Sequence, residues 1–156
     1  MIVKNELIAT DKQNGKSQPY ILIAEDDADD RFLLETAFEE SGFTDKIVFA
    51  ENGVDLLDYL NNQLSDGAPR FPAFILLDLN MPKKDGREVL KEIKQHPVLR
   101  KIPVVVFTTT KHEKDISKCY ELGANSYIVK PASFDDLVRV VATLRNYWFV
   151  TSTYPI

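Results

Sequence analysis

The sequence is poor in several features that would place it outside ordinary globular proteins. Its 156 residues include one cysteine, Cys119, so no disulfide can form within the chain. Apolar runs such as residues 74–77 and 102–107 are far shorter than the roughly 20 residues that cross a bilayer as a helix. The beginning of the chain lacks the charged and then apolar pattern of a secretory signal. We therefore predict a cytoplasmic protein.

Positive charge is also scarce. The chain has 19 Lys and Arg residues against 24 Asp and Glu residues, which gives a formal net charge of −5 and a pI near 5.1. Nucleic acids and anionic lipid surfaces are bound by clustered Lys and Arg side chains. The composition therefore predicts no nucleic-acid partner and no membrane partner, and it favours proteins or metal ions.

The length and composition fit a single domain. A chain of 156 residues with 44% hydrophobic content can bury one full core. Residues 1–19 include a polar stretch with Gly and Pro, which is typical of a flexible N-terminal arm. We expect the domain to cover residues 20–148 and a C-terminal tail to follow at residues 149–156.

From residue 20 onward, short apolar runs alternate with longer segments of helical periodicity. This pattern is typical of a parallel sheet covered by helices on both faces. Strands are expected at residues 20–24, 46–50, 73–78, 104–108 and 126–129, and helices at residues 28–41, 53–64, 86–95, 112–122 and 134–148. These pairs predict an α/β, doubly wound, flavodoxin-like (βα)5 fold, with a five-stranded parallel sheet in the strand order 2-1-3-4-5.

Some helix ends carry a signal in the sequence. Residues 110–113 (TKHE) and 133–136 (SFDD) have the pattern of capping boxes, so helices are expected to begin after Thr110 and Ser133. Gly42 and Gly123 stand where a helix would end.

Acidic side chains follow two of the predicted strands. Glu25, Asp26 and Asp27 follow the first strand, and Asp78 ends the third. The carboxyl ends of parallel strands meet at one edge of a sheet, where ligands bind. Mg²⁺ prefers oxygen ligands and accepts one or two carboxylates beside a phosphate. Asp26 and Asp78 could supply these carboxylates, which predicts a divalent-cation site at this edge.

Two more polar residues are expected at the same edge. Thr108 ends the fourth strand, and Lys130 follows the fifth. If a cation holds a phosphoryl oxygen, Asp78 can attack phosphorus as a nucleophile while Lys130 and Thr108 bind the transferred oxygens. Phosphoryl transfer needs positioning and charge stabilisation more than a proton-shuttling histidine.

Each acid also has a structural interpretation. Acids after a strand often stabilise the start of the following helix, which is the interpretation we give to Asp29 and Asp30 and leave open for Asp27. A lone Asp at a strand end is more often a turn residue than a nucleophile. The combination of Asp78 with Lys130 and the acids after the first strand favours the phosphoacceptor.

Together, four motifs resemble the receiver domain of two-component response regulators. They are ILIAEDD at 21–27, ILLDLNMPKKDG at 75–86, VVVFTTT at 104–110 and SYIVKP at 126–131, and the similarity covers about residues 20–148. The resemblance implies a response regulator that accepts a phosphoryl group from a sensor histidine kinase, using Mg²⁺ or alternatively Mn²⁺. It further implies that the protein signals by a conformational switch and is no enzyme beyond its own phosphorylation and dephosphorylation.

The resemblance assigns a role to each residue of the site. Glu25 and Asp26 form the acidic pair, Asp78 takes the phosphoryl group, and the main-chain carbonyl of Asn80 completes the metal shell. Lys130 pairs with the added charge. The peptide bond after Lys130 precedes a proline and is expected to be cis, a geometry that costs about 0.5–1 kcal/mol.

The resemblance also implies a switch. Thr108 moves toward the phosphoryl group and Tyr127 turns inward after it; the alternative for Tyr127 is an edge-strand aromatic half packed on a helix. Asn80 and Thr110 flank the path of an attacking water, so they are expected to set the lifetime of the phosphorylated state. The output surface is expected on the last two helices and the last strand.

Within the family, the loop before residue 73, the segment KKDGREVL at 83–90 and the aromatic C-terminal end look most like the small receivers paired with bacterial phytochromes. A bacterial phytochrome is therefore a candidate kinase. The apolar run YWFV at 147–150 suggests a homodimer, formed together with the output surface, or a docking tail. The alternative is that this run folds back over the domain's own core. No DNA-binding output domain is expected after residue 156.

Other functions fit parts of the pattern. A phosphatase of the haloacid dehalogenase type also uses an Asp nucleophile, but it needs a second acid two positions later, where Asn80 stands. A flavodoxin would need a phosphate loop where Glu25, Asp26 and Asp27 repel phosphate. A protein-binding module that has the receiver fold but is never phosphorylated stays open.

Overall fold

A computed structural model describes residues 2–4, 19–44 and 46–153 of the chain. A six-stranded sheet lies at its centre, in the order β1-β3-β2-β4-β5-β6. The parallel strands are β2 (Ile21–Ala24), β3 (Ile47–Ala50), β4 (Phe74–Leu77), β5 (Val104–Thr108) and β6 (Ser126–Val129). The helices are α1 (Ala28–Glu40), α2 (Gly53–Ser65), α3 (Gly86–Gln95), α4 (Glu113–Glu121) and α5 (Phe134–Arg145), and a short 3-10 helix, η1 (Leu99–Lys101), precedes β5.

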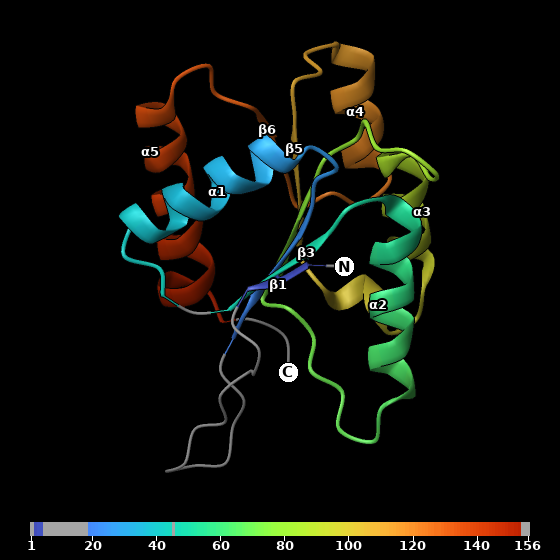
Figure 1. Cartoon of the computed structure of the whole chain (residues 1–156). Coiled ribbons are helices and arrows are strands. Elements are labelled where there is room, and N and C mark those ends of the chain that lie inside the picture. Colours follow the sequence, from blue (N-terminus) through green and yellow to red (C-terminus); the bar gives the residue numbers. More distant parts are fainter. Residues whose placement is uncertain (1, 5–18, 45, 154–156) are drawn as a thin grey trace.

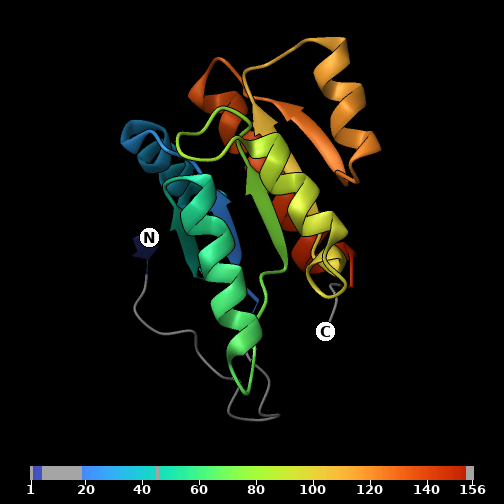
Figure 2. The ribbon, with the colours of Figure 1, turned by 90° about the vertical axis from the view of Figure 1, so that its right-hand side faces the viewer.

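The predicted fold class is confirmed. The five parallel strands follow the flavodoxin-like order 2-1-3-4-5, and each predicted strand lies within one residue of an observed one. Helices α1 and α5 lie side by side on one face of the sheet, while α2 and α3 cover the other (Figures 1 and 2). Side chains alternate between the two cores: Ile21 and Ile23 pack on the α1–α5 side, and Leu22 and Ala24 on the α2–α3 side.

A sixth strand occupies the edge of the sheet. Residues 2–4, which were expected in a flexible arm, form β1 (Ile2–Lys4), which pairs antiparallel with β3. A strand of three residues is too short to give a periodic signal, so the sequence could not predict it. Residues 5–18 of the predicted arm lie outside the described residues.

The helix starts agree with the sequence in one case and differ in the other. Ser133 caps α5, because its side chain accepts a hydrogen bond from the Asp136 backbone N–H. The prediction that Thr110 caps α4 is wrong. This helix begins at Glu113, and the Thr110 hydroxyl instead accepts a hydrogen bond from Asn80. Gly42 and Gly123 end helices with positive φ of 90° and 106°, as expected.

The aromatic C-terminal end divides into two parts. A π-helical segment, η2 (Asn146–Thr151), follows α5, and in it Trp148 stacks on Phe74 at 6.0 Å between ring centroids while Phe149 packs on Phe43 at 5.2 Å. The alternative that this run folds back over the core is therefore correct for Trp148 and Phe149. Tyr147 and Val150 are 50% and 69% exposed, so within the run at 147–150 they are the side chains most available to a partner.

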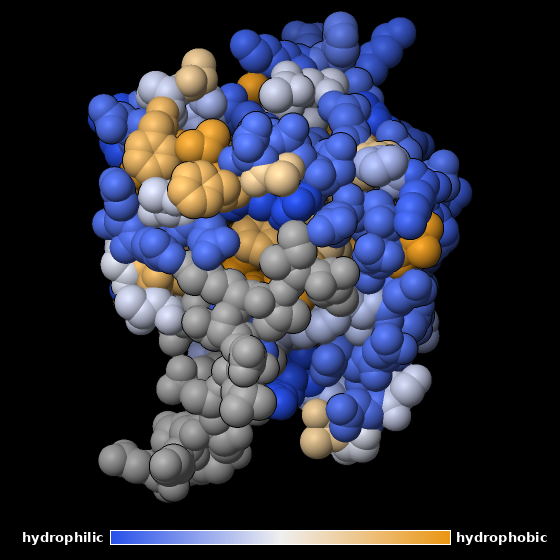
Figure 3. Space-filling view, in the orientation of Figure 1, coloured by the Kyte–Doolittle hydropathy of each residue, from blue (hydrophilic) through white to orange (hydrophobic). Residues whose placement is uncertain are grey.

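Charged and polar residues dominate the surface view, and a group of apolar side chains gathers near α1 (Figure 3). The exposed large apolar residues of α1 are Phe32 and Leu33, at 68% and 42% exposure. Within the described part of the chain, no helix is both long and apolar enough to cross a membrane.

Candidate functional site

Strand register brings the predicted site residues to one edge of the sheet. Ala24 of β2 lies opposite Leu77 of β4, so the residues that follow them, Glu25 and Asp78, are neighbours. The Asp78 N–H donates to the carbonyl oxygen of Ala24 at 3.2 Å. The N–H of Lys130, just after β6, donates to the carbonyl of Thr108 at the end of β5. Four strand ends therefore converge, as the sequence predicted.

A glycine lets α3 begin beside the end of β4. The N–H of Gly86 donates to the carbonyl of Leu79 at 2.8 Å. A Cβ atom at Gly86 would lie 2.3 Å from the carbonyl oxygen of Asp78, a distance that real contacts do not reach. Any side chain at this position would push the backbone of Asp78 away, so Gly86 is part of what positions the acid.

The three acids Glu25, Asp26 and Asp78 form a compact cluster. One carboxylate oxygen from each lies within 4.8 Å of the others. Glu25 and Asp78 are buried, whereas Asp26 is exposed. Oxygen ligands of this kind suit Mg²⁺ or Mn²⁺, and the exposed Asp26 leaves the site open to solvent. The residues therefore fit a divalent cation; the predicted ligand role of the Asn80 carbonyl stays a prediction.

Lys130 lies among these acids. Its Nζ is 2.5 Å from Oε1 of Glu25 and 3.0 Å from Oδ2 of Asp78. Nζ is also 6.0 Å from the ring centroid of Phe107. The remaining carboxylate oxygens bond to the backbone: Oε2 of Glu25 accepts from the Asp27 N–H, and Oδ1 of Asp78 accepts from the Asn80 N–H. Both buried carboxylates are thus held by two contacts each.

Burial and the charges of the cluster together shift the pKa values of Glu25 and Lys130. Burial raises the pKa of Glu25 to about 7, although the hydrogen bond and charge of Lys130 oppose this rise. Burial alone lowers the pKa of Lys130, but the hydrogen bonds and charges of Glu25 and Asp78 outweigh it and raise the pKa above its ordinary value. Lys130 therefore stays cationic, and one ammonium faces more than one carboxylate, which leaves room for a second cation.

Asn80 links the loop after β4 to the loop after β5. Its Nδ2 donates to the hydroxyl of Thr110 at 3.3 Å and lies 3.5 Å from the hydroxyl of Thr108. Thr108 is fully buried, while Asn80 is exposed. The structure thus joins the predicted switch hydroxyl to the two residues predicted to set the lifetime of the phosphorylated state.

Tyr127 reaches the same loop from β6. Its hydroxyl donates to the carbonyl of Thr110 at 2.7 Å, and its ring packs partly buried against the α2–α3 core. Burial raises the pKa of Tyr127 above its ordinary value. The side chain therefore points toward the loop after Thr108, which suits the switch role that the sequence predicted for it.

Three residues at the start of α1 contact the site or the loop before it, and the sequence did not predict all of these contacts. Asp27 caps α1, because its Oδ1 accepts from the Asp30 N–H at 2.9 Å. Arg31 donates to the carbonyls of Glu25 and Asp26 at 3.0 and 2.9 Å, which fixes the loop between β2 and α1. Asp30, which was interpreted only as a helix-start residue, lies 3.7 Å from Nζ of Lys130. No spacing rule links residue 30 to residue 130.

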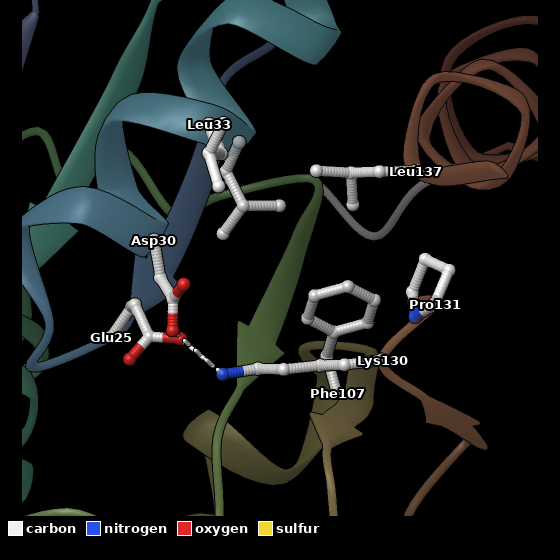
Figure 4. A pocket seen from close by; sticks show the side chains of 8 residues that line it. Glu25, Asp30, Leu33, Phe107, Lys130, Pro131 and Leu137 are labelled. Atoms are coloured by element: carbon white, nitrogen blue, oxygen red, sulfur yellow. Dashed lines mark hydrogen bonds and ion pairs between the residues drawn. The ribbon is translucent and has the colours of Figure 1, made fainter. Parts of the chain in front are cut away.

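A small pocket borders the cluster between α1 and α5 (Figure 4). The acids and the ammonium lie at one end, and the rest of the lining is apolar: Leu33, Leu34, Phe107, Pro131 and Leu137. The expected cis bond between Lys130 and Pro131 is wrong, because the described residues contain no cis peptide bond. The trans isomer is the intrinsically favoured form of an X–Pro bond.

Comparison with known proteins identifies the family. The model of the response regulator receiver domain matches residues 21–142, and the chain belongs to this family. It is 45% identical to a probable methanogenesis regulatory protein, FilR2, of Methanothrix harundinacea, over 82% of each chain. It is 41% identical to the response regulator Rcp1 of Synechocystis, over 86% of this chain and 92% of Rcp1. It is thus a receiver-domain protein of two-component signalling, a class whose members generally signal rather than act as enzymes.

Two solved structures resemble this one closely. A Mn²⁺-bound form of Rcp1 superposes with a TM-score of 0.79 at 40% identity, covering 89% of this chain and 100% of that one. The phosphorylated cyanobacterial phytochrome response regulator RcpA superposes with a TM-score of 0.81 at 38% identity, covering 89% and 99%. Receiver domains bind Mg²⁺ or Mn²⁺ at an acidic site and partner with histidine kinases, and the cluster of Glu25, Asp26 and Asp78 fits such a site.

Proposed function

We propose that this receiver accepts a phosphoryl group from the phosphohistidine of a sensor histidine kinase onto Asp78. The observation that carries the proposal is the gathering of Glu25, Asp26 and Asp78 within 4.8 Å, with Lys130 3.0 Å from Asp78. These residues come from three separate segments and have no shared structural task that would require so much buried charge. A site that receives a charged group explains why they meet.

The proposed transfer needs a nucleophile and balanced charge. A carboxylate oxygen of Asp78 forms the new bond to phosphorus as the bond from phosphorus to the donor nitrogen breaks. The electron pair of that bond stays on the nitrogen, so a donor imidazole that carries a proton on its other nitrogen leaves as a neutral ring. Lys130 and the hydroxyl of Thr108 bind the transferred oxygens.

The cation would be held by Asp26, Asp78 and the main-chain carbonyl of Asn80, beside Glu25. When bound, Mg²⁺ or Mn²⁺ supplies positive charge that offsets the repulsion between these carboxylates and an incoming phosphoryl group. Glu25 is tied to Lys130 and to the Asp27 N–H, so we assign it to orienting Lys130 as much as to the cation.

Phosphorylation adds about 1.5–2 negative charges at Asp78 and shifts a pre-existing equilibrium. Thr108 then moves toward the phosphoryl group, and Tyr127 follows through the loop whose carbonyl it already contacts at Thr110. Asn80 and Thr110 flank the phosphorus and set the lifetime of the modified state. The signal leaves through α4, β6 and α5.

Similarity to known receivers indicates the kinase, and exposed residues indicate the surface that binds a second copy. The similarity to RcpA supports a bacterial phytochrome as the kinase, in the cytoplasm. A second copy of this chain would bind through α4, β6 and α5, together with the exposed Tyr147 and Val150 of η2. Light scattering of the full chain with and without beryllofluoride and Mg²⁺ tests the dimer: its mass should double in the activated form, and an unchanged monomer mass contradicts it.

Incubation with acetyl phosphate and Mg²⁺, followed by intact-mass analysis, tests the phosphoacceptor. The wild type should gain the mass of one phosphoryl group, and Asp78→Asn should gain none. Asp26→Asn serves as a metal-site control, because it should require more Mg²⁺ for the same gain. An equal gain in the wild type and in Asp78→Asn contradicts the assignment, as does a wild type that gains nothing, which would leave the unphosphorylated binding module.

A further inference from the structure

Three carboxylates surround the ammonium of Lys130, and they are not equivalent. Glu25 and Asp78 are buried strand-end residues at 2.5 and 3.0 Å, whereas Asp30 belongs to α1 and approaches to 3.7 Å. The Asp30 side chain is 47% exposed, against 2% and 9% for the other two. Figure 4 shows Glu25 and Asp30 facing the same end of Lys130. Lys130 is therefore shared between the phosphoacceptor and helix α1.

The place of Asp30 is fixed by the structure around it. Its own N–H donates to Oδ1 of Asp27, and the next residue, Arg31, donates to two carbonyls of the loop that carries Glu25. These bonds hold the first turn of α1 against the site. The hydrogen bonds at the helix start thus hold Asp30 near Lys130. Its neighbour Asp29 has the same charge and also lies in the first turn, but among the described residues it forms no ion pair with Lys130.

We propose that Asp30 is a positioning residue that draws Lys130 partly away from Asp78 and so slows phosphorylation; this inference rests on the proposed function. During phosphorylation Lys130 must bind the transferred oxygens. Its attraction to the carboxylate of Asp30 is lost in this step, which raises the barrier to phosphorylation. A half-exposed ion pair contributes about 0–1 kcal/mol. Removing the charge of Asp30 should therefore speed the phosphorylation of Asp78 by at most about fivefold.

The test compares Asp30→Asn with Asp29→Asn in the full chain, at saturating Mg²⁺, by quenched intact-mass analysis. Both variants remove one negative charge from the first turn of α1, so both lose the same favourable interaction with the helix dipole. We expect Asp30→Asn to be phosphorylated two- to fivefold faster than the wild type, in line with that limit, and Asp29→Asn to match the wild type. Equal rates in the two variants would overturn the inference.

Two phosphodonors separate positioning from simple repulsion of the donor. Acetyl phosphate carries more negative charge than phosphoramidate, so repulsion by Asp30 would slow the first donor more. If Asp30 acts through Lys130, Asp30→Asn accelerates both donors by the same factor; an acceleration seen only with acetyl phosphate contradicts the inference. A wild type that gains no phosphoryl group from either donor would instead count against the proposed function.

Discussion

The ammonium of Lys130 lies 2.5 Å from Oε1 of Glu25, although 105 positions separate the two residues in the chain. One follows β6 and the other follows β2, and only the parallel order of the sheet brings them together. Glu25 is 2% exposed, so its charge depends on this contact. The pair therefore connects the stability of the domain to the chemistry proposed for Asp78.

Replacing Lys130 by methionine should destabilise the protein and make it depend on divalent cations. Without the ammonium, Glu25 and Asp78 face each other as buried acids, which should lower the free energy of unfolding by about 1–3 kcal/mol. Mg²⁺ should restore more stability to Lys130→Met than it adds to the wild type, because it supplies the missing charge. Urea unfolding with and without Mg²⁺ measures both effects.

Lys84→Met is the matched control, because Lys84 precedes α3 and pairs with Glu92 of that helix at a partly exposed site. Its loss should stay below about 1 kcal/mol and should not respond to Mg²⁺. A Lys130→Met variant that behaves like this control would contradict the charge balance described for the site.

Replacing Thr108 by valine should separate binding from switching. Valine keeps the shape of this fully buried residue but removes the hydroxyl, which lies 3.5 Å from Nδ2 of Asn80. Beryllofluoride should bind about tenfold more weakly, as expected for one lost hydrogen bond of about 1–1.5 kcal/mol. The NMR signals of Tyr127 should no longer shift on binding, whereas Thr108→Ser should retain the shift. A full Tyr127 response in Thr108→Val would exclude the proposed coupling.

Tyr20 predicts how stability depends on alkaline pH. Its hydroxyl donates to the Arg70 carbonyl at 2.5 Å and accepts from Tyr59, and burial raises its pKa far above the ordinary value of 10.0. The folded state therefore holds a proton that the unfolded chain releases near pH 10, so this stabilisation is complete below pH 10 and decreases as the pH rises. Unfolding titrations between pH 8 and about 11 should show the decline in the wild type.

Tyr20→Phe should weaken that decline. It should also cost about 1–2 kcal/mol at pH 8, because the Tyr59 hydroxyl loses its acceptor. The exposed Tyr147→Phe should change neither quantity. Identical alkaline profiles for the wild type and Tyr20→Phe would show that Tyr20 does not control this range.

Substitutions of Trp148 and Tyr147 test whether these aromatic side chains pack on the core of their own domain or against a second copy. Trp148→Ala should cost about 1–3 kcal/mol, because it removes a partly buried ring that stacks on Phe74 at 6.0 Å. Tyr147→Ala should cost less than about 0.5 kcal/mol. The losses should not depend on protein concentration, as measured by thermal unfolding over a hundredfold dilution. A concentration-dependent loss in Trp148→Ala would place this ring in an interface between copies instead.

Much of the fold and the core of the site could be predicted because their signals are local. Apolar strands buried on both faces are continuous runs, and an acid or a lysine directly after such a run must lie at the carboxyl edge of the sheet. Glu25, Asp78 and Lys130 were found this way. Gly86 lies in the quoted motif at 75–86, but the sequence did not predict that it approaches the Asp78 carbonyl so closely.

The misses depend on tertiary contacts. Asp30 has the sequence signature of any helix start, and only the packing of α1 beside α5, near the residue that follows β6, brings it to Lys130. Thr110 has the signature of a cap, but its hydroxyl is used by Asn80 and the helix begins later. Trp148 lies beyond the regular part of α5, and hydropathy alone could not decide whether its ring meets solvent, a partner or Phe74.

A crystal structure of the full chain grown with Mn²⁺ tests the central claim most directly, because anomalous scattering locates this metal without ambiguity. The account predicts one strong peak between the carboxylates of Asp26 and Asp78, next to the main-chain carbonyl of Asn80, which should disappear in Asp26→Asn combined with Asp78→Asn. A peak elsewhere, or no peak at saturating Mn²⁺, would contradict the claim that these acids gather to hold a divalent cation.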